Sequence, residues 1–242
     1  MKPGAEKSTV EEIRRRFDND VERFSNLETG QAAMMDSRLM LDLAAETAAA
    51  LHPEAKRLLD IGCGAGNYTL ALMQALPSIA EVTLIDLSRP MLERASERIG
   101  AARAVRIDAR QCDIREAELA EAHYDVAVAA GVFHHLRGEG EWRETFAKAA
   151  RSLKPGGSLW IVDMIEHTES AVQAAQWRRY GDYLTGLRDE AYRDHVFAYI
   201  EKEDTPRPLV WQLDLLRACG FGAAEVLHKR GPFALYGGVK KG

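Results

Sequence analysis

The sequence LLDIGCGAGN, residues 58–67, joins a short apolar run to three glycines at alternate positions. The apolar run, from Arg57 to Ile61, is typical of a strand buried on both faces of a parallel sheet. From Tyr68 onward the apolar residues repeat at helical spacing until Pro77. A strand that turns through glycines into a helix presents free backbone N–H groups and the positive end of a helix dipole to a ligand. We therefore predict a ligand-binding turn at this position.

The glycine spacing separates two classes of ligand. Dinucleotide-binding folds use G-x-G-x-x-G, whereas here a single residue separates Gly64 from Gly66. Asp60 lies two residues before Gly62, where its carboxylate would face a cationic amino-acid group rather than a pyrophosphate. The run DIGCGAGN resembles the first motif of class I S-adenosylmethionine (SAM) dependent methyltransferases. This resemblance implies a SAM site that includes Asp60, Gly62, Cys63, Gly64 and Gly66.

The length and composition of the chain limit the classes of protein to which it can belong. A chain of 242 residues suits one α/β domain, so we expect a single domain over residues 1–242. The net charge of −5 gives no general argument for binding nucleic acid or an anionic membrane. The three scattered cysteines form no metal-ligand or disulfide pattern, which favours a reducing compartment. Because we find neither a signal-peptide core nor a membrane-spanning run, we expect a cytoplasmic protein without nucleic-acid or membrane partners.

Strand and helix patterns alternate along the middle of the chain, which predicts an α/β fold whose parallel sheet has helices on both faces. The final segment reads as a hairpin of two strands. The expected strands cover residues 57–61, 82–87, 104–108, 124–130, 158–163, 222–228 and 233–239, with a turn at 154–157. The resemblance implies a Rossmann-like sheet of seven strands in the order 3-2-1-4-5-7-6, with strand 7 antiparallel.

Two helical regions flank this sheet. N-terminal helices are expected within residues 8–52, one over 8–24 and one over 34–51. The resemblance implies that such helices lie over the cofactor pocket. Residues 164–205 have no strand pattern, yet six of the chain's 18 aromatic residues fall there. We therefore predict a helical cap inserted between the fifth strand and the last helix.

Asp86 ends the second predicted strand. Open α/β sheets bind ligands at the carboxyl ends of their strands, and a carboxylate there can accept hydrogen bonds from both ribose hydroxyls. A helix-capping or solvated aspartate would give the same pattern. Leu87 and Met91 follow, and their side chains could pack on the faces of the adenine.

The resemblance implies the remaining cofactor contacts. Asp113 matches the residue of the family that accepts a hydrogen bond from the adenine amino group, with Ile114 beside it. A structural role for Asp113 is the alternative. Gly131 and the segment that follows it, including Phe133, would lie along the methionine part of SAM.

His134 and His135 occur in the sequence GVFHHL, which resembles the segment that borders the methyl group in many small methyltransferases. A histidine, whose pKa is about 6.5, could act as a general base at neutral pH. Alternatively, the pair orders the loop and closes the cofactor pocket. We expect no metal site, because adjacent histidine side chains diverge and the sequence indicates no third ligand.

Trp177 and Tyr180 recur at helical spacing in the predicted cap. They could form an aromatic wall around a substrate, with Arg178 or Arg179 meeting an acidic group on it. The alternative is a stripe that buries itself on the domain. Tyr236 in the last predicted strand could line the same side of the pocket.

The whole chain resembles small bacterial and archaeal methyltransferases of unassigned substrate. We therefore expect transfer of a methyl group from SAM to a small-molecule substrate, with S-adenosylhomocysteine (SAH) as product, by a monomer or homodimer. In-line displacement depends chiefly on positioning, so it requires no indispensable acid or base.

Three rival functions remain open. More distantly, the chain resembles the tRNA wobble-uridine carboxy-SAM synthase, which has a basic residue in its cap. Arg178, Arg179 and Arg188 lie close to that position, but none aligns with it. An NAD-dependent oxidoreductase would need the glycine spacing that this chain lacks. The third rival is a non-catalytic SAM-binding module, which would bind SAM without transferring its methyl group.

Overall fold

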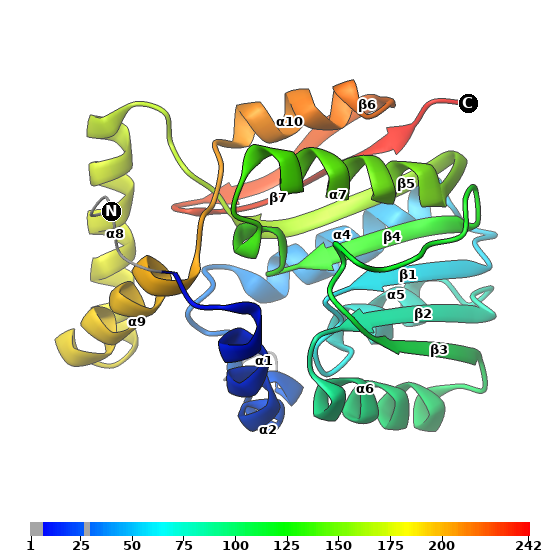
Figure 1. Cartoon of the computed structure of the whole chain (residues 1–242), viewed down its shortest axis with the longest axis horizontal. Coiled ribbons are helices and arrows are strands. Elements are labelled where there is room, and N and C mark those ends of the chain that lie inside the picture. The colour runs from blue at the N-terminus through cyan, green and yellow to red at the C-terminus, as the bar shows by residue number, and fades with distance from the viewer. Residues whose placement is uncertain (1–6, 27–29) are drawn as a thin grey trace.

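One seven-stranded sheet organises the computed structural model, which describes residues 7–26 and 30–242 (Figure 1). Its strands are β1 (Arg57–Ile61), β2 (Glu81–Asp86), β3 (Arg106–Gln111), β4 (Tyr124–Ala130), β5 (Leu153–Met164), β6 (Phe221–Arg230) and β7 (Phe233–Lys240). Their order across the sheet is β3-β2-β1-β4-β5-β7-β6. Neighbouring strands from β3 to β5 are parallel, and β7 is antiparallel to both β5 and β6. The predicted fold class and strand order are confirmed.

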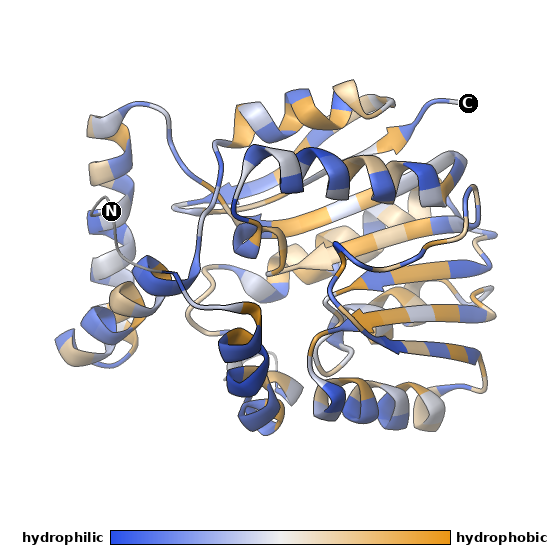
Figure 2. Cartoon of the chain, viewed as in Figure 1, coloured by the Kyte–Doolittle hydropathy of each residue, from blue (hydrophilic) through white to orange (hydrophobic). Residues whose placement is uncertain are grey.

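Helices form a layer on each face of the sheet. The first layer contains α4 (Ser37–Leu51), α5 (Asn67–Ala75) and α6 (Arg89–Ala102), and the second contains α7 (Glu139–Ser152) and α10 (Leu209–Ala218). Figure 2 shows the central strands mainly in hydrophobic colours, while the helices carry hydrophilic residues on their outer sides. The sheet is therefore the apolar middle of three layers.

The sequence of β4 illustrates why its apolar run is continuous. Val126 and Val128 pack in the core formed with α4, α5 and α6, whereas Ala127 and Ala129 pack in the core formed with α7 and α10. All four side chains are fully buried. Because both faces of the strand are covered there, these four consecutive positions must be apolar.

The N-terminal region consists of shorter helices than the sequence predicts. A capping box between Thr9 and Glu12 starts α1 (Val10–Asn19), but the expected helix over 8–24 breaks at Asp20, and α2 (Val21–Ser25) follows. The helix expected over 34–51 begins only at Ser37, because Asp36 has left-handed backbone angles. The predicted segment 8–52 includes residues 27–29, which lie outside the described residues.

Two helices, α8 (Ser170–Leu187) and α9 (Glu190–Glu203), occupy the segment between β5 and α10. Figure 1 shows them beyond the edge of the sheet at which the parallel strands end. Tyr180 and Tyr183 on α8 donate hydrogen bonds to the carbonyl oxygens of Ala33 and Ala32, at 3.0 and 2.8 Å. These bonds fasten α8 to the segment that precedes α4. None of the helices among the described residues is both long and apolar enough to cross a membrane.

Several predicted strand boundaries were wrong. The turn expected at 154–157 is an irregular part of β5, which pairs with β4 at Leu153 and again from Ser158 after a register shift. The edge strand β3 covers Arg106–Gln111 rather than 104–108, since its register follows β2 and its half-exposed residues form no apolar run. The hairpin strand β6 extends to Arg230 because pairing with β7 continues to that residue.

Candidate active site

The glycine turn lies between β1 and α5, as the sequence predicts. Gly62 has a φ of 67°, and a Cβ added there would lie 2.3 Å from Cγ2 of Val132. Gly62 therefore permits both the left-handed backbone and the close approach of the loop after β4. The backbone N–H groups of Gly62 and Cys63 donate to the carbonyl of Ile85, which ties the turn to the end of β2.

Asp60 is a buried carboxylate at the end of β1, only 1% exposed. Its Oδ2 accepts a hydrogen bond of 2.6 Å from the Thr69 hydroxyl on α5. Burial raises the pKa of Asp60 to about 7, with a smaller contribution from the charge of Asp86. Among the described residues, no cationic side chain forms an ion pair with Asp60. The site is thus complementary to a ligand that carries a positive charge.

Asp86 ends β2 directly beside the glycine turn. Its Oδ2 accepts a hydrogen bond from the N–H of Gly64 and its Oδ1 accepts one from the N–H of Ser88, both at 2.8 Å. Burial outweighs these bonds and raises the pKa of Asp86 to about 6. Each oxygen keeps further acceptor capacity, since a carboxylate oxygen can accept about two hydrogen bonds. The arrangement can hold a ligand hydroxyl as well as the backbone.

A cavity of about 490 Å³ lies beside these strand ends. Leu87 and Asp113 form one wall, and His135 contributes to it from the loop after β4. The remaining lining residues are Lys7, Ser8, Thr9, Val10, Ile13, Arg115 and Arg137. The cavity therefore brings together residues that the sequence placed in the adenine and methyl-group regions, and the N-terminal segment covers it.

The carboxylate of Asp113 is already engaged within the protein. Arg115 binds it through Nε and Nη2, at 3.0 and 2.6 Å, and through its backbone N–H. Although burial opposes it, this hydrogen bonding lowers the pKa of Asp113. The structural role that the sequence left as an alternative is therefore present, and an adenine amino group would have to share Asp113 with Arg115.

His134 lies between two buried carboxylates. Its Nδ1 donates a hydrogen bond to Oδ1 of Asp163 on β5, and its Nε2 lies 3.6 Å from Oδ1 of Asp204 at the end of α9. Burial alone would lower the pKa of His134, but the two carboxylate charges together raise it to about 9. In this arrangement His134 is an imidazolium at neutral pH and cannot accept a proton from a substrate.

His135 has the opposite character. Burial, followed by the charge of His134, holds the pKa of His135 well below its usual range. The sequence led us to expect that the two side chains diverge. Instead, the ring centroids of His134 and His135 lie only 4.2 Å apart. Asp204 also supplies a third potential metal ligand, 3.4 Å from Nδ1 of His135. Both reasons for expecting no metal site were therefore wrong.

Comparison with known proteins finds a methyltransferase domain in the middle of the chain. Residues 58–157, from β1 into β5, match the methyltransferase domain family. The malonyl-[acyl-carrier protein] O-methyltransferase of Anoxybacillus flavithermus is 33% identical over 57% of this chain and 46% of its own length. Residues 58–157 therefore carry a methyltransferase domain, and the whole chain has the fold of the class I SAM-dependent methyltransferases.

Other relatives agree with this assignment. The demethylmenaquinone methyltransferase of Staphylococcus aureus is 27% identical over 67% of this chain and 64% of its own length. The chain spans about half the length of several of the curated proteins that it matches. A Burkholderia thailandensis 1,6-didemethyltoxoflavin-N1-methyltransferase, solved with 1,6-didemethyltoxoflavin and SAH, has a TM-score of 0.64. It is 18% identical, covers 98% of this chain and 93% of its own, and so supports the fold alone.

SAM is the cofactor of this family, and the buried groups at the strand ends fit it. SAM carries positive charge on its amino group and its sulfonium, and Asp60 is a buried carboxylate without a cationic partner among the described residues. The ribose presents hydroxyl donors, and Asp86 has acceptor capacity left. Asp60 therefore offers a negative charge for the cationic part of SAM, and Asp86 offers a hydrogen-bond acceptor for the ribose.

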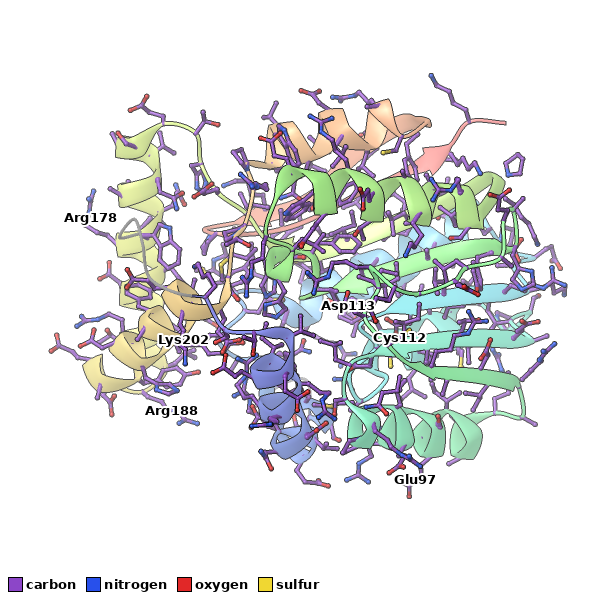
Figure 3. All side chains as sticks on the ribbon, in the orientation of Figure 1. Glu97, Cys112, Asp113, Arg178, Arg188 and Lys202 are labelled. Carbon is purple, nitrogen blue, oxygen red and sulfur yellow. The ribbon has the colours of Figure 1, made fainter. Side chains whose placement is uncertain are left out.

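The side chains of three predicted site residues point away from the cavity, so Tyr236 and Arg178 do not line it, whereas the backbone contact expected at Phe133 stays a prediction. The Phe133 side chain is fully buried against Trp142 and Phe146, so only its backbone faces the loop. The Tyr236 side chain is fully buried on the α10 side of the sheet, where its hydroxyl bonds to Gln212. Figure 3 shows Arg178 on the outer side of α8, pointing away from the sheet.

The remaining predicted residues are close to the turn or in the core. Met91 and Ile114 are 1% and 6% exposed and contribute mainly to packing. Gly131, with a φ of 70°, starts the turn that leads to the histidines. In the cap, Trp177 packs edge-on against Tyr180, with ring centroids 5.8 Å apart, and Tyr180 is 1% exposed. Trp177 and Tyr180 therefore belong to a stripe that packs on the domain, and they do not form an open aromatic wall.

The sequence reasoning missed Asp163 and Asp204. Asp163 ends a buried apolar strand, as Asp60 and Asp86 do, and that shared pattern could have identified it. Nothing comparable marks Asp204, whose position depends on how α9 docks onto the loop after β4.

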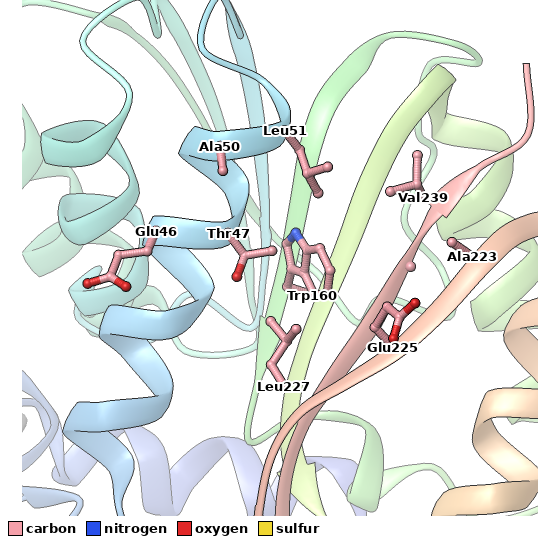
Figure 4. Close-up of a pocket in the computed structure, with 10 residues that line it drawn as sticks. Glu46, Thr47, Ala50, Leu51, Trp160, Ala223, Glu225, Leu227 and Val239 are labelled. Atoms are coloured by element: carbon pink, nitrogen blue, oxygen red, sulfur yellow. The ribbon is translucent and has the colours of Figure 1, made fainter.

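A second cavity, of about 500 Å³, contains none of the predicted site residues (Figure 4). It lies between α4 and the strands β5, β6 and β7, with Trp160 at its base. The lining is mostly apolar and includes Leu51, Leu227 and Val239. Unlike the first cavity, it has neither Leu87 nor Asp113 in its lining.

Proposed function

We propose that this methyltransferase transfers the methyl group of SAM to a small-molecule acceptor bound beside the loop after β4. The observation that carries the proposal is the convergence of the glycine turn, Asp60, Asp86 and the cavity lined by His135 at one edge of the sheet. The N-terminal segment and the end of α9 cover this edge, which supports an acceptor small enough to be enclosed.

The proposed cofactor contacts follow from charge and hydrogen-bonding capacity. Asp60 would face the amino group, Asp86 the ribose, and the glycine turn would let the backbone approach the methionine part. Leu87 would pack beside the adenine. When bound, SAM supplies a methyl group that its sulfonium already activates for displacement.

The chain's own contribution would be positioning rather than acid–base catalysis. His134 holds its proton between Asp163 and Asp204, so we assign it an orienting role. His135 is neutral and borders the cavity, where it can accept a hydrogen bond from an acceptor group. Orientation can supply more rate than the roughly 10²–10⁴-fold of a general base. His135→Ala should therefore retain measurable turnover.

For the acceptor we propose only its class, a small molecule. Relatives are named for a malonyl group on acyl-carrier protein and for demethylmenaquinone, so their acceptors differ in chemistry. A carboxy-SAM synthase would need a cation for the additional carboxylate. The cap arginines Arg178, Arg179 and Arg188 are all exposed. Of the cations that line the cavity, Arg115 is paired with Asp113, and Lys7 and Arg137 donate to backbone carbonyl oxygens at the end of α9. Methyl transfer from SAM itself is therefore the better-supported reaction.

Calorimetry with SAM tests the cofactor site. Asp86→Ala should weaken SAM binding by about 30- to 1000-fold, or roughly 2–4 kcal/mol, because it removes charge-assisted hydrogen bonds from a buried site. Asp125→Ala is a matched control. Its carboxylate also accepts hydrogen bonds from two backbone N–H groups, those of Lys56 and Arg57, but at the opposite ends of the strands. Near-native affinity in Asp86→Ala would remove this residue from the site.

The reaction is tested by incubating the full chain with methyl-labelled SAM and a panel of hydroxyl, amine, thiol and carboxyl acceptors. We expect SAH and one labelled product. A copurified or newly formed carboxylated nucleoside, seen by mass spectrometry, would instead indicate a carboxy-SAM synthase. Tight SAM binding without transfer to any acceptor would favour a non-catalytic binding module.

A further inference from the structure

Three potential metal ligands meet where the loop after β4 touches the end of α9. His134, His135 and Asp204 each offer one ligand atom, and these atoms all lie within 4.8 Å of one another. Oδ1 of Asp204 is 3.6 Å from Nε2 of His134 and 3.4 Å from Nδ1 of His135. Tetrahedral Zn²⁺ holds nitrogen and oxygen ligands at about 2.0–2.2 Å, which places them about 3.4 Å apart. The two distances to Asp204 agree with that geometry.

Two of these atoms are buried without a hydrogen-bond partner. Among the described residues, neither Nδ1 of His135 nor Oδ1 of Asp204 makes a hydrogen bond. The Asp204 side chain is only 2% exposed. Buried polar atoms are normally paired, and an ion bound to both of these atoms would satisfy them.

The third residue is oriented as metal-binding histidines usually are. Nδ1 of His134 donates to the buried carboxylate of Asp163, which leaves Nε2 to face Asp204. Metal-ligating histidines almost always donate their other N–H to a carboxylate or carbonyl in this way. Without a metal, Nε2 carries a proton that faces Asp204 alone, and a bound ion would have to displace that proton. The proton would satisfy His134 but would leave Nδ1 of His135 unpaired.

We propose that His134, His135 and Asp204 bind one divalent transition-metal ion, with Zn²⁺ as the best match to two imidazoles and a carboxylate. The neighbouring cation Arg16 is paired with Glu203, so part of its charge is offset. Asp204 follows α9 and both histidines belong to the loop after β4. The ion would therefore fasten the cap to the loop that borders the cavity.

The test uses the full chain after treatment with EDTA and desalting. Co²⁺ serves as the probe, since its visible absorption reports coordination by nitrogen and oxygen. We expect one equivalent to bind, Zn²⁺ to displace it, and the Tm to rise on binding. His135→Ala and Asp204→Asn should each weaken binding by at least about 10-fold, because removing even an indirect partner of a metal site costs that much.

The half-buried pair His228 and Asp36, 2.9 Å apart, provides matched controls. His228→Ala and Asp36→Asn should bind Co²⁺ like the unaltered protein. Absence of a cobalt band at millimolar Co²⁺ would overturn the proposal, as would full-strength binding by His135→Ala or an equal loss in the control variants. Circular dichroism establishes that each variant is folded. The proposal does not rest on methyl transfer, because cobalt binding is measured without SAM or an acceptor.

Discussion

Replacing Asp60 by asparagine should change the pH dependence of stability in a defined direction. The pKa of the Asp60 carboxyl is 3.8 in the unfolded reference and rises to about 7 in the folded protein. Between these values the folded state binds more protons than the unfolded state, so this group stabilises the protein at low pH and loses that contribution as pH rises. The asparagine side chain does not titrate and lacks this dependence.

The magnitude follows from the two pKa values. Between pH 5 and pH 8, the linkage relation gives a loss of about 2–3 kcal/mol for the aspartate. The difference in unfolding free energy between Asp60→Asn and the unaltered protein should therefore shift by about 2–3 kcal/mol in favour of asparagine over that interval. Any fixed cost of the substitution, such as a poorer bond to Thr69, cancels because it is present at both pH values.

Urea denaturation followed by tryptophan fluorescence measures this double difference. Asp125→Asn is the control, because the pKa of Asp125 is lowered and its carboxylate is ionised throughout the interval in both states. Its difference from the unaltered protein should not change with pH. A shift below about 1 kcal/mol for Asp60→Asn would refute the assignment of a buried, uncompensated carboxylate. The same variant should bind SAM more weakly at pH 8, where the aspartate is charged.

Three further predictions concern the turn, the histidine loop and the cap. Gly62→Ala puts a Cβ 2.3 Å from Val132 on a left-handed backbone, so urea denaturation should give a loss of roughly 2–4 kcal/mol, and an unchanged midpoint would contradict this. Asp163→Ala leaves His134 without its buried partner; calorimetry in EDTA should show a loss of about 3–5 kcal/mol, while Asp163→Asn should lose less. In hydrogen exchange, SAH should protect residues 164–205 as well as the glycine turn; protection of the turn alone would make the cap a structural appendage.

The glycine turn and the carboxylates at the strand ends could be predicted because their signals are local. A buried strand, a glycine turn and the start of a helix follow one another within about twenty residues. Strand ends in a parallel sheet share one edge, so the pattern also placed Asp60 and Asp86 together. The hydrogen bond from Gly64 to Asp86 is the direct result of that placement.

Side-chain direction was harder to predict than position. Phe133 follows the left-handed turn at Gly131, and past such a turn the alternation of a strand no longer tells which way a side chain points. Tyr236 faces α10 because β7 pairs with β5 in one register, and the sequence of the hairpin does not fix that register. Both side chains are apolar enough to fill the core, and burial decided their direction.

The other half of the site depends on contacts between distant segments. Asp204 reaches the histidines because Lys7 and Arg137 donate to carbonyl oxygens at the end of α9, and Thr205 donates to the carbonyl of His134. These pairs are between 66 and 197 residues apart, so no local pattern contains them. The charge state of His134 depends on the same docking, since Asp204 is one of the two carboxylates that raise its pKa. A change in the cap can therefore alter the chemistry beside the acceptor while the glycine turn stays intact, so the acceptor has to be sought by experiment on the folded protein.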